Sequence, residues 1–242
     1  MSIQEQYGPI ADLRLAREKL ALGALARRYF AHDFEGRTHA RNVARLAVRL
    51  GRAFSLPRHD LIAIAVGATL HDIGKLTVPA AVLETPRMLT SAEWAVVRTH
   101  PARGDVLVSP LIRHPIVRSA IRWHHERIDG RGYPDRLSGP EIPLPARIVA
   151  VADAYEALVA ARPYSAPRSA AAALAELVEC AGSQFDAECV RRLVAIDRST
   201  SGGEADPSAR SRRATRRAPT TGVRSTSRTS RAWSASSFGC GP

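Results

Sequence analysis

The strongest constraint on the fold is negative: between Ala11 and Ile196 no stretch alternates apolar and polar residues as a half-buried strand would. Apolar residues instead recur at helical spacing, and Gly and Pro interrupt them at short intervals. Six prolines fall near expected helix starts or breaks, where a missing N–H does least harm: Pro57, Pro79, Pro101, Pro115, Pro143 and Pro167. The sequence therefore predicts an all-α domain, with helices at about 11–30, 43–50, 61–70, 91–98, 114–125, 144–160, 168–181 and 186–196. The stretch 61–70 is apolar on nearly every side, as a central buried helix would be.

The chain of 242 residues is long enough for one principal domain with flanking segments. We expect a helical lead segment over residues 1–33 that packs on the domain, the domain itself over 34–197, and a tail over 198–242. The tail holds nine arginines against Glu204 and Asp206, and it has almost no large apolar residues. Such a segment is expected to be disordered. Non-specific contact with nucleic acid is one reading of its charge, and a solvated appendage without a defined role is the other.

No segment predicts a membrane span or a secretory signal. The longest apolar run, Leu61 to Leu70, is too short to cross a bilayer, and the first ten residues lack a basic start and an apolar stretch. The three cysteines show no CxxC spacing, so the sequence indicates neither a disulfide framework nor a thiolate zinc site. We expect a cytoplasmic protein with no membrane partner.

A His-Asp pair ends the most apolar of the expected helices. His71 and Asp72 are costly to bury unless they are paired or bind a metal ion. Gly74 follows and permits the helix to stop, so that both side chains and Lys75 can face a common cavity. Only two of the 35 basic residues are lysines, which suggests a need for a compact ammonium at position 75.

A second cluster contains two adjacent histidines, His124 and His125, in the segment WHHERIDGRGYP. Neighbours on a helix diverge by about 100°, so this pair is expected to serve two metals, or a metal and a ligand, and not one ion from one side. Taken alone, one core and one surface histidine would explain the pair. The loop that follows has glycines and one aromatic residue, which suits close approach of main chain to a ligand.

Three further positions are candidates. Glu35 and His39 are four residues apart and can share a helix face, and His100 lies at a predicted helix break. Asp153 lies within the apolar run IVAVADAYEAL, where a carboxylate needs a metal or an arginine partner. On pattern alone, His39 and His100 are more often structural than ligating.

In this order, the motifs HDIGK, HHERIDGRGYP, VAD, RPY and SQFD resemble the HD-GYP branch of the HD phosphohydrolase superfamily. The resemblance runs from about Phe34 to Val194. It implies an HD-type helical bundle around a centre of two or three transition-metal ions, Fe or Mn, that hydrolyses cyclic di-GMP to pGpG, with further cleavage to GMP left open. The implied metal ligands are Glu35 (for a third ion), His39, His71, Asp72, His100, His124, His125 and Asp153.

The resemblance also implies roles for other residues. Asp72 is expected to bridge two ions and, with Lys75, to act in catalysis, because paired metals activate a hydroxide and neutralise phosphoryl charge. The implied substrate-binding residues are Lys75, Gly132, Tyr133, Pro134 and Arg162. Glu156 stands where the family commonly has Asp, and Ser165 stands where it often has a basic residue.

Two alternative functions remain open at this point. One is a non-catalytic signalling module that binds a cyclic dinucleotide, or a diguanylate cyclase (GGDEF) partner through the GYP loop. The other assigns the function to the basic tail, which would recruit nucleic acid.

Overall fold

The computed structural model describes residues 21, 23–31, 34–160 and 167–201. Within these ranges the chain is helical, and its only β-type pairing is one isolated bridge between Ala181 and Phe185, so the predicted all-α class is confirmed. The longer helices are α2 (Phe34–Ala53), α3 (Arg58–Leu70), α6 (His100–Val108), α7 (Pro115–Trp123), α8 (Leu144–Val159), α9 (Ala170–Glu179) and α10 (Ala187–Ser201). The shorter ones are the 3₁₀ helices η1 (Ile73–Thr77) and η2 (Gly139–Glu141), and the α-helices α4 (Ala80–Leu83) and α5 (Ser91–Val97).

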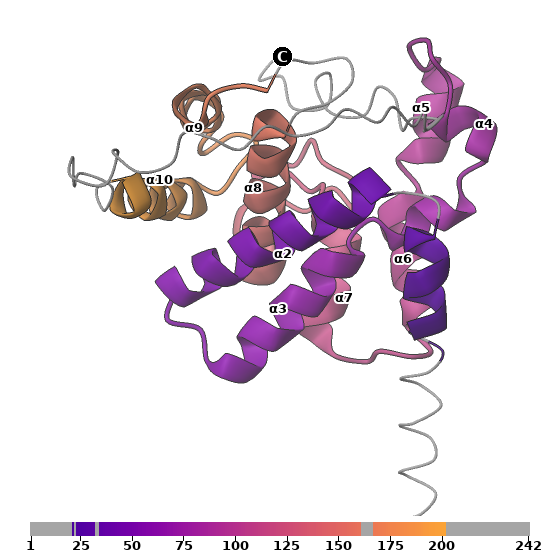
Figure 1. Cartoon of the computed structure of the whole chain (residues 1–242), viewed down its shortest axis with the longest axis horizontal. Helices are drawn as coiled ribbons and strands as arrows, with labels where there is room; N and C mark the ends of the chain where they lie inside the picture. The colour runs from indigo at the N-terminus through magenta and orange to yellow at the C-terminus, as the bar shows by residue number, and fades with distance from the viewer. Residues whose placement is uncertain (1–20, 22, 32–33, 161–166, 202–242) are drawn as a thin grey trace, which may run out of the picture.

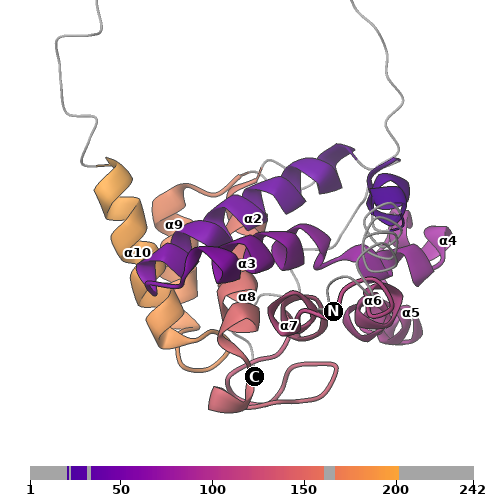
Figure 2. The same cartoon turned by 90° about the horizontal axis from the view of Figure 1, so that it is seen from below.

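Helix α8 is the centre of the bundle. It packs against α2, α7 and α9, while α3 packs on α2 and α7, and α6 packs on η1 and α7 (Figure 1). Helices α9 and α10 lie together at one end of the bundle, and α4 and α5 lie at the other (Figure 2). Eleven of the 16 residues of α8 are buried, which its almost continuous apolar sequence requires.

The prediction that residues 61–70 form a central buried helix is wrong for one side of that helix. Helix α3 does bury Ala63, Ile64 and Ala68, but Ile62 on its other side is 56% exposed. The apolar periodicity does not tell a helix that is enclosed on all sides from one that has an apolar side open to its surroundings.

The segment RTHPARG was expected to be a break between helices. The break is present, but a helix that was not expected, α6, begins within the same segment. Helix α5 ends at Val97, and α6 begins at His100 with Pro101 in its first turn. Proline fits this position because the first N–H groups of a helix have no intrahelical partner. The helix expected at 114–125 ends earlier, at Trp123.

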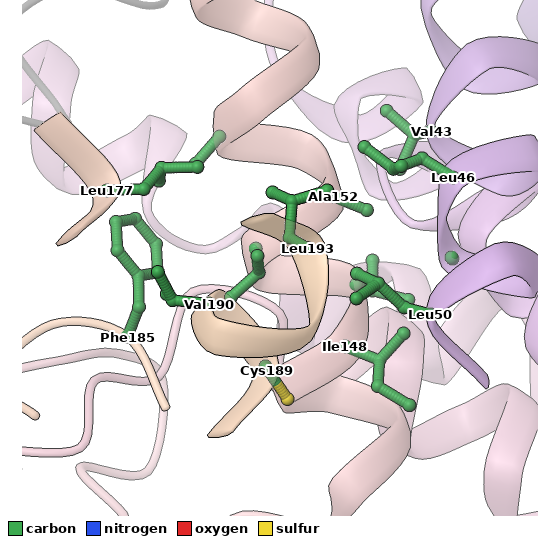
Figure 3. Close-up of a cluster of buried hydrophobic side chains, with 14 of the residues drawn as sticks. Val43, Leu46, Leu50, Ile148, Ala152, Leu177, Phe185, Cys189, Val190 and Leu193 are labelled. Carbon is green, nitrogen blue, oxygen red and sulfur yellow. The ribbon is translucent and has the colours of Figure 1, made fainter. Parts of the chain in front are cut away.

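The larger hydrophobic core joins α2, α8, α9 and α10. Side chains from these helices, including Leu50, Ile148, Leu177 and Leu193, meet there with at most 1% of their surface exposed (Figure 3). Burial of one such side chain contributes about 1.5–3 kcal/mol. This core fixes α2 against α8 and therefore sets the spacing between residues on those two helices.

A smaller core lies between α3, η1, α6 and α7, and it includes Ile73 and Ile121. Leu25, Ala26 and Tyr29, from a helical segment over residues 23–30, pack against it. The rest of the predicted lead segment and nearly all of the predicted tail lie outside the described residues, while α10 continues to Ser201. In the part of the chain that the structure describes, no helix combines the length and apolarity needed to cross a membrane.

Candidate metal centre

Seven of the predicted ligands converge on one place, although they come from five parts of the bundle. Most of them lie at helix ends: His71 follows α3, Asp72 comes next, His100 starts α6, and His124 and His125 follow α7. His39 and Asp153 come instead from within α2 and α8. Their ligand atoms form two groups, each within 4.8 Å: Asp72, His100, His124 and His125 in one, and His39, His71 and Asp153 in the other.

Asp72 connects the two groups. Its Oδ1 lies 3.1 Å from Nε2 of His100 in the first group, and its Oδ2 lies 3.3 Å from Nε2 of His71 in the second. Asp153 belongs to the second group, with Oδ1 at 3.0 Å from Nε2 of His39 and 3.8 Å from Nε2 of His71. A carboxylate with each oxygen directed at a different group has the geometry of a bridging ligand.

The adjacent pair His124 and His125 does not diverge as expected. Their ring centroids lie 4.1 Å apart, and both belong to the group of Asp72. The expected divergence assumed that both residues were helical, but α7 ends at Trp123 and the pair follows it. The prediction that the pair serves two metals, or a metal and a ligand, rested on that divergence, whereas this arrangement places both rings in one candidate group of ligands.

Backbone carbonyls fix the orientation of the buried imidazoles. Nδ1 of His71, His100 and His124 lies 2.7, 2.9 and 2.9 Å from the carbonyl oxygen three residues earlier. An oxygen acceptor at this distance requires Nδ1 to carry the proton, which leaves the Nε2 lone pair of each ring directed at the centre. Each of these histidines lies where a helix ends or begins, and carbonyls near a helix end lack partners.

His39 is held differently, by a side chain. Its Nδ1 forms a short hydrogen bond with Glu156, and the other oxygen of Glu156 accepts from Asn42 Nδ2 at 3.2 Å. Glu156 is 6% exposed and lies on α8, one turn after Asp153. Helix α8 therefore supplies two carboxylates to His39. Asp153 lies near its metal-binding nitrogen, and Glu156 orients its ring.

The pKa values of the imidazoles differ across the centre because their charged neighbours differ. Burial and the neighbouring imidazoles lower the pKa of His124, and burial with His100 lowers that of His125 to about 3, so both are neutral near pH 7. Burial opposes the charged form of His39 too, but Asp153 and Glu156 outweigh it and raise the pKa to about 10. Metal ions take the place of such protons, because a ligating imidazole must be deprotonated at the coordinating nitrogen.

The donor set fits transition-metal ions. Among the described residues, Nε2 of His71 has no hydrogen-bond partner although it is buried, and Nε2 of His100 faces Nε2 of His124 at 3.4 Å. Since all three nitrogens carry lone pairs, this packing is unfavourable without a cation between them. Five imidazoles with two carboxylates suit Fe, Mn or Zn better than Mg or Ca, which prefer oxygen ligands.

Lys75 and Tyr133 border the centre. Nζ of Lys75 lies 2.5 Å from Oδ2 of Asp72. Burial opposes the charged form of that carboxyl, but Lys75 and His71 outweigh it and hold the pKa of Asp72 well below its usual value. The ring of Tyr133 stacks on His125 with centroids 4.8 Å apart, and Arg98 lies 5.7 Å above the tyrosine ring. The sequence analysis did not predict a role for Arg98. Its only signal was its place two residues before His100, in the segment RTHPARG.

The loop that carries Tyr133 is anchored by two acidic residues that sequence reasoning did not assign. Buried Glu126 accepts a hydrogen bond from the backbone N–H of Asp135 at 2.7 Å. The Asp135 carboxylate in turn accepts from Arg122 and from Trp123 Nε1, both at 2.7 Å. A Cβ on Gly132 would lie within 2.7 Å of the backbone oxygen of His125, so glycine is required there for packing.

Some predicted residues lie outside what the structure describes. Arg162 and Ser165 fall in the segment 161–166, and Glu35 lies in α2 but its side chain is not among those described. Their predicted roles therefore stay predictions. Pro134 lies beside Tyr133 in the anchored loop and is partly buried.

A model of the HD domain family matches residues 15–189 of this chain. The chain belongs to the HD domain family. It is 39% identical over 180 residues to the cyclic di-GMP phosphodiesterase response regulator RpfG of Xanthomonas campestris, which covers 74% of this chain and 48% of that protein. It is 32% identical over 192 residues to the 3′3′-cGAMP-specific phosphodiesterase 2 of Vibrio cholerae, with 78% and 37% covered. This HD domain chain thus spans about half or less of the length of these curated relatives.

Solved structures share the fold of this HD domain. A cyclic GMP-AMP specific phosphodiesterase of V. cholerae superimposes with a TM-score of 0.55 at 19% identity, over 76% of this chain and 50% of the other. The HD domain of the phosphodiesterase PgpH of Listeria monocytogenes, in complex with cyclic-di-AMP, gives 0.53 at 14% identity, over 74% and 96%. At these identities the likeness establishes the helical architecture alone.

Proposed function

We propose that this chain is a metal-dependent phosphodiesterase of the HD-GYP branch that hydrolyses cyclic di-GMP to pGpG. The observation that carries the proposal is the convergence of two ligand groups joined by Asp72. Two metal ions held about 3.5–4 Å apart supply a hydroxide nucleophile and neutralise charge on a phosphodiester. A non-catalytic binding module has no need for two adjoining groups of buried imidazoles and carboxylates, which are costly to keep.

The residues of the chain have distinct roles in this proposal. Asp72 would help to hold both ions, and the other six ligands in the two groups would fix their positions. Lys75 beside Asp72 offers a compact ammonium to a phosphate oxygen at the centre. Tyr133 forms a wall of the substrate site, and its packing on His125 links the position of the GYP loop to the metal ligands.

The proposal also covers a third ion, the role of Arg162, the end product, a protein partner and the location of the protein. A third ion would be held through Glu35, Arg162 would contact phosphate or guanine, and cleavage to GMP would follow in a second step. A diguanylate cyclase would bind at the GYP loop, where Arg131, Asp135 and Arg136 are exposed. We further propose a cytoplasmic location. Both named phosphodiesterase relatives act on cyclic dinucleotides, which supports the substrate class.

Product identification tests the proposal. The protein is loaded anaerobically with Fe²⁺ or Mn²⁺ and incubated with cyclic di-GMP, and the products are separated by chromatography. We expect pGpG to form first, and we expect a chelator-treated sample to form none. A parallel reaction with the mixed cyclic GMP-AMP dinucleotide as competitor ranks the two substrates, since relatives of both specificities exist. Tight binding of cyclic di-GMP by fully metal-loaded protein, without hydrolysis, would overturn the proposal.

A further inference from the structure

A groove lies between α2 and α3, on the outside of the bundle. These two helices run side by side in Figure 1, and the groove between them has a volume of about 600 Å³. Phe30, from the helical segment over residues 23–30, also lines it. None of the proposed metal ligands lines this groove.

The floor of the groove is apolar. It is formed by Ala44 and Val48 of α2 with Ala65 and Thr69 of α3. The Thr69 hydroxyl donates to the Ala65 carbonyl at 2.7 Å, so it is satisfied within its own helix. Ile62, 56% exposed, lies one turn before Ala65 and extends this apolar side of α3. A helix that is apolar on every side is normally covered on every side.

The rim of the groove is basic. Arginines recur along α2 at Arg37, Arg41, Arg45, Arg49 and Arg52, all exposed and all lining the groove. Within the described ranges no carboxylate forms an ion pair with Arg41, Arg45 or Arg52. The only acidic residue of α2 is Glu35, at the opposite end from Arg52. The rim therefore carries a concentrated positive charge along α2.

The groove faces away from the metal centre. Counting about 100° per residue along α2, Arg41, Arg45, Val48 and Arg52 fall on one side, and His39 falls about 120–180° away from them. A molecule bound in the groove would therefore leave the centre open. It would nevertheless contact the helix that carries His39.

We propose that this groove is a docking site for an acidic amphipathic helix of a partner protein. The five arginines extend over about 22 Å of helix axis, which matches a partner helix of about 15 residues. A linear rim with an apolar floor fits a helix that places apolar residues in the groove and carboxylates along its flanks. Charge complementarity of this kind speeds association and sets the orientation of the partner.

The other candidate occupants fit less well. The segment 198–242 of the same chain has nine arginines against two acidic residues, so the rim repels it. Nucleic acid is bound chiefly through its phosphates and would leave the apolar floor uncovered. The docking proposal does not depend on the proposed catalytic function, because it uses none of its residues.

A synthetic peptide tests the proposal on the full-length chain. The probe is a fluorescein-labelled helix of about 18 residues with leucines on one face and glutamates on its flanks. Its control has the same composition but distributes the leucines around the helix. Binding is measured by anisotropy at 0.15 M salt for wild type, for R41E/R45E, and for A65E, which fills the floor but keeps the arginines. The variant R113E/R198E makes the same change in net charge at exposed positions elsewhere.

We expect saturable binding of the probe to wild type, about tenfold or more weaker binding to R41E/R45E and to A65E, and a change of less than about twofold for R113E/R198E. The control peptide should bind about tenfold more weakly than the probe. Circular dichroism checks that each variant folds. The proposal would be overturned if R41E/R45E and R113E/R198E lost the same affinity for the probe. It would also be overturned if the probe and the control peptide bound wild type equally well. It would also fail if duplex DNA or phosphatidylglycerol vesicles bound this surface and the probe did not.

Discussion

The metal centre and the larger hydrophobic core draw mainly on different parts of the bundle. The core takes its side chains from helix interiors, such as Leu50 in α2 and Leu193 in α10. The centre takes most of its ligands from helix ends, where free carbonyls orient His71 and His124. Stability and chemistry are therefore assigned largely to different residues. Substitutions in the two regions should separate turnover from the free energy of unfolding.

The largest effect is expected at the residue that joins the two ligand groups. Asp72→Ala should reduce turnover by about 1,000-fold or more, because loss of a bridging carboxylate disassembles the metal pair. The helices should remain folded, since the variant removes a buried charge and no large apolar side chain. Steady-state kinetics and circular dichroism measure the two effects. Asp186→Ala is the control, as Asp186 pairs with Arg147 and caps α10; it should lose stability and keep turnover.

The opposite result is expected in the core. Leu193→Ala should lower the free energy of unfolding by about 2–5 kcal/mol, because it leaves a cavity beside α8 and α2. Turnover per folded molecule should be unchanged. Urea unfolding and metal content of the folded protein measure both. A variant that unfolds no more easily than wild type but loses its metal would show that the two regions are not separate.

Glu156 connects the two regions, because it lies on the central helix α8 and orients the proposed ligand His39. Glu156→Gln should weaken metal affinity by about 10–100-fold, with turnover restored by excess metal, since the proposed ligands themselves are intact. Titration with Mn²⁺ followed by electron paramagnetic resonance measures the affinity. The matched control is Glu179→Gln on the exposed side of α9, which should bind metal as wild type does. Unchanged affinity in Glu156→Gln would remove its positioning role.

The smallest effect is expected at the start of α5, which contributes no side chain to either region. Thr90 caps α5 and forms a reciprocal capping box with Glu93. Thr90→Ala should cost about 1 kcal/mol of stability. Neither metal content nor turnover should change. Thermal unfolding measures the loss, and a loss of bound metal in this variant would contradict the separation.

The sequence was sufficient to predict the helical class and the residues that converge, but not how they are held. Periodicity identified α8 and α10, because their apolar patterns are regular. It missed α6, because a proline after His100 suggests a break as readily as a helix start. It also could not show that one side of α3 is open, because exposure depends on which helices pack against it.

Sequence reasoning also missed contacts between distant segments. Glu156 was noted only as a departure from the family pattern, and its bond to His39 spans 117 positions. A signal was present, since a second carboxylate within the apolar run of α8 needs a partner as much as Asp153 does. The anchor formed by Glu126 and Asp135 depends on how the loop folds back, which spacing alone does not predict.

The central claim is that one pocket of this chain holds paired cations. Anomalous diffraction at the Fe or Mn edge, on crystals of anaerobically loaded protein, tests it directly. The account predicts at least two anomalous peaks about 3.5–4 Å apart, with Asp72 contacting both and the remaining ligands divided as in the two groups. A single peak, or peaks held by residues outside these groups, would contradict it.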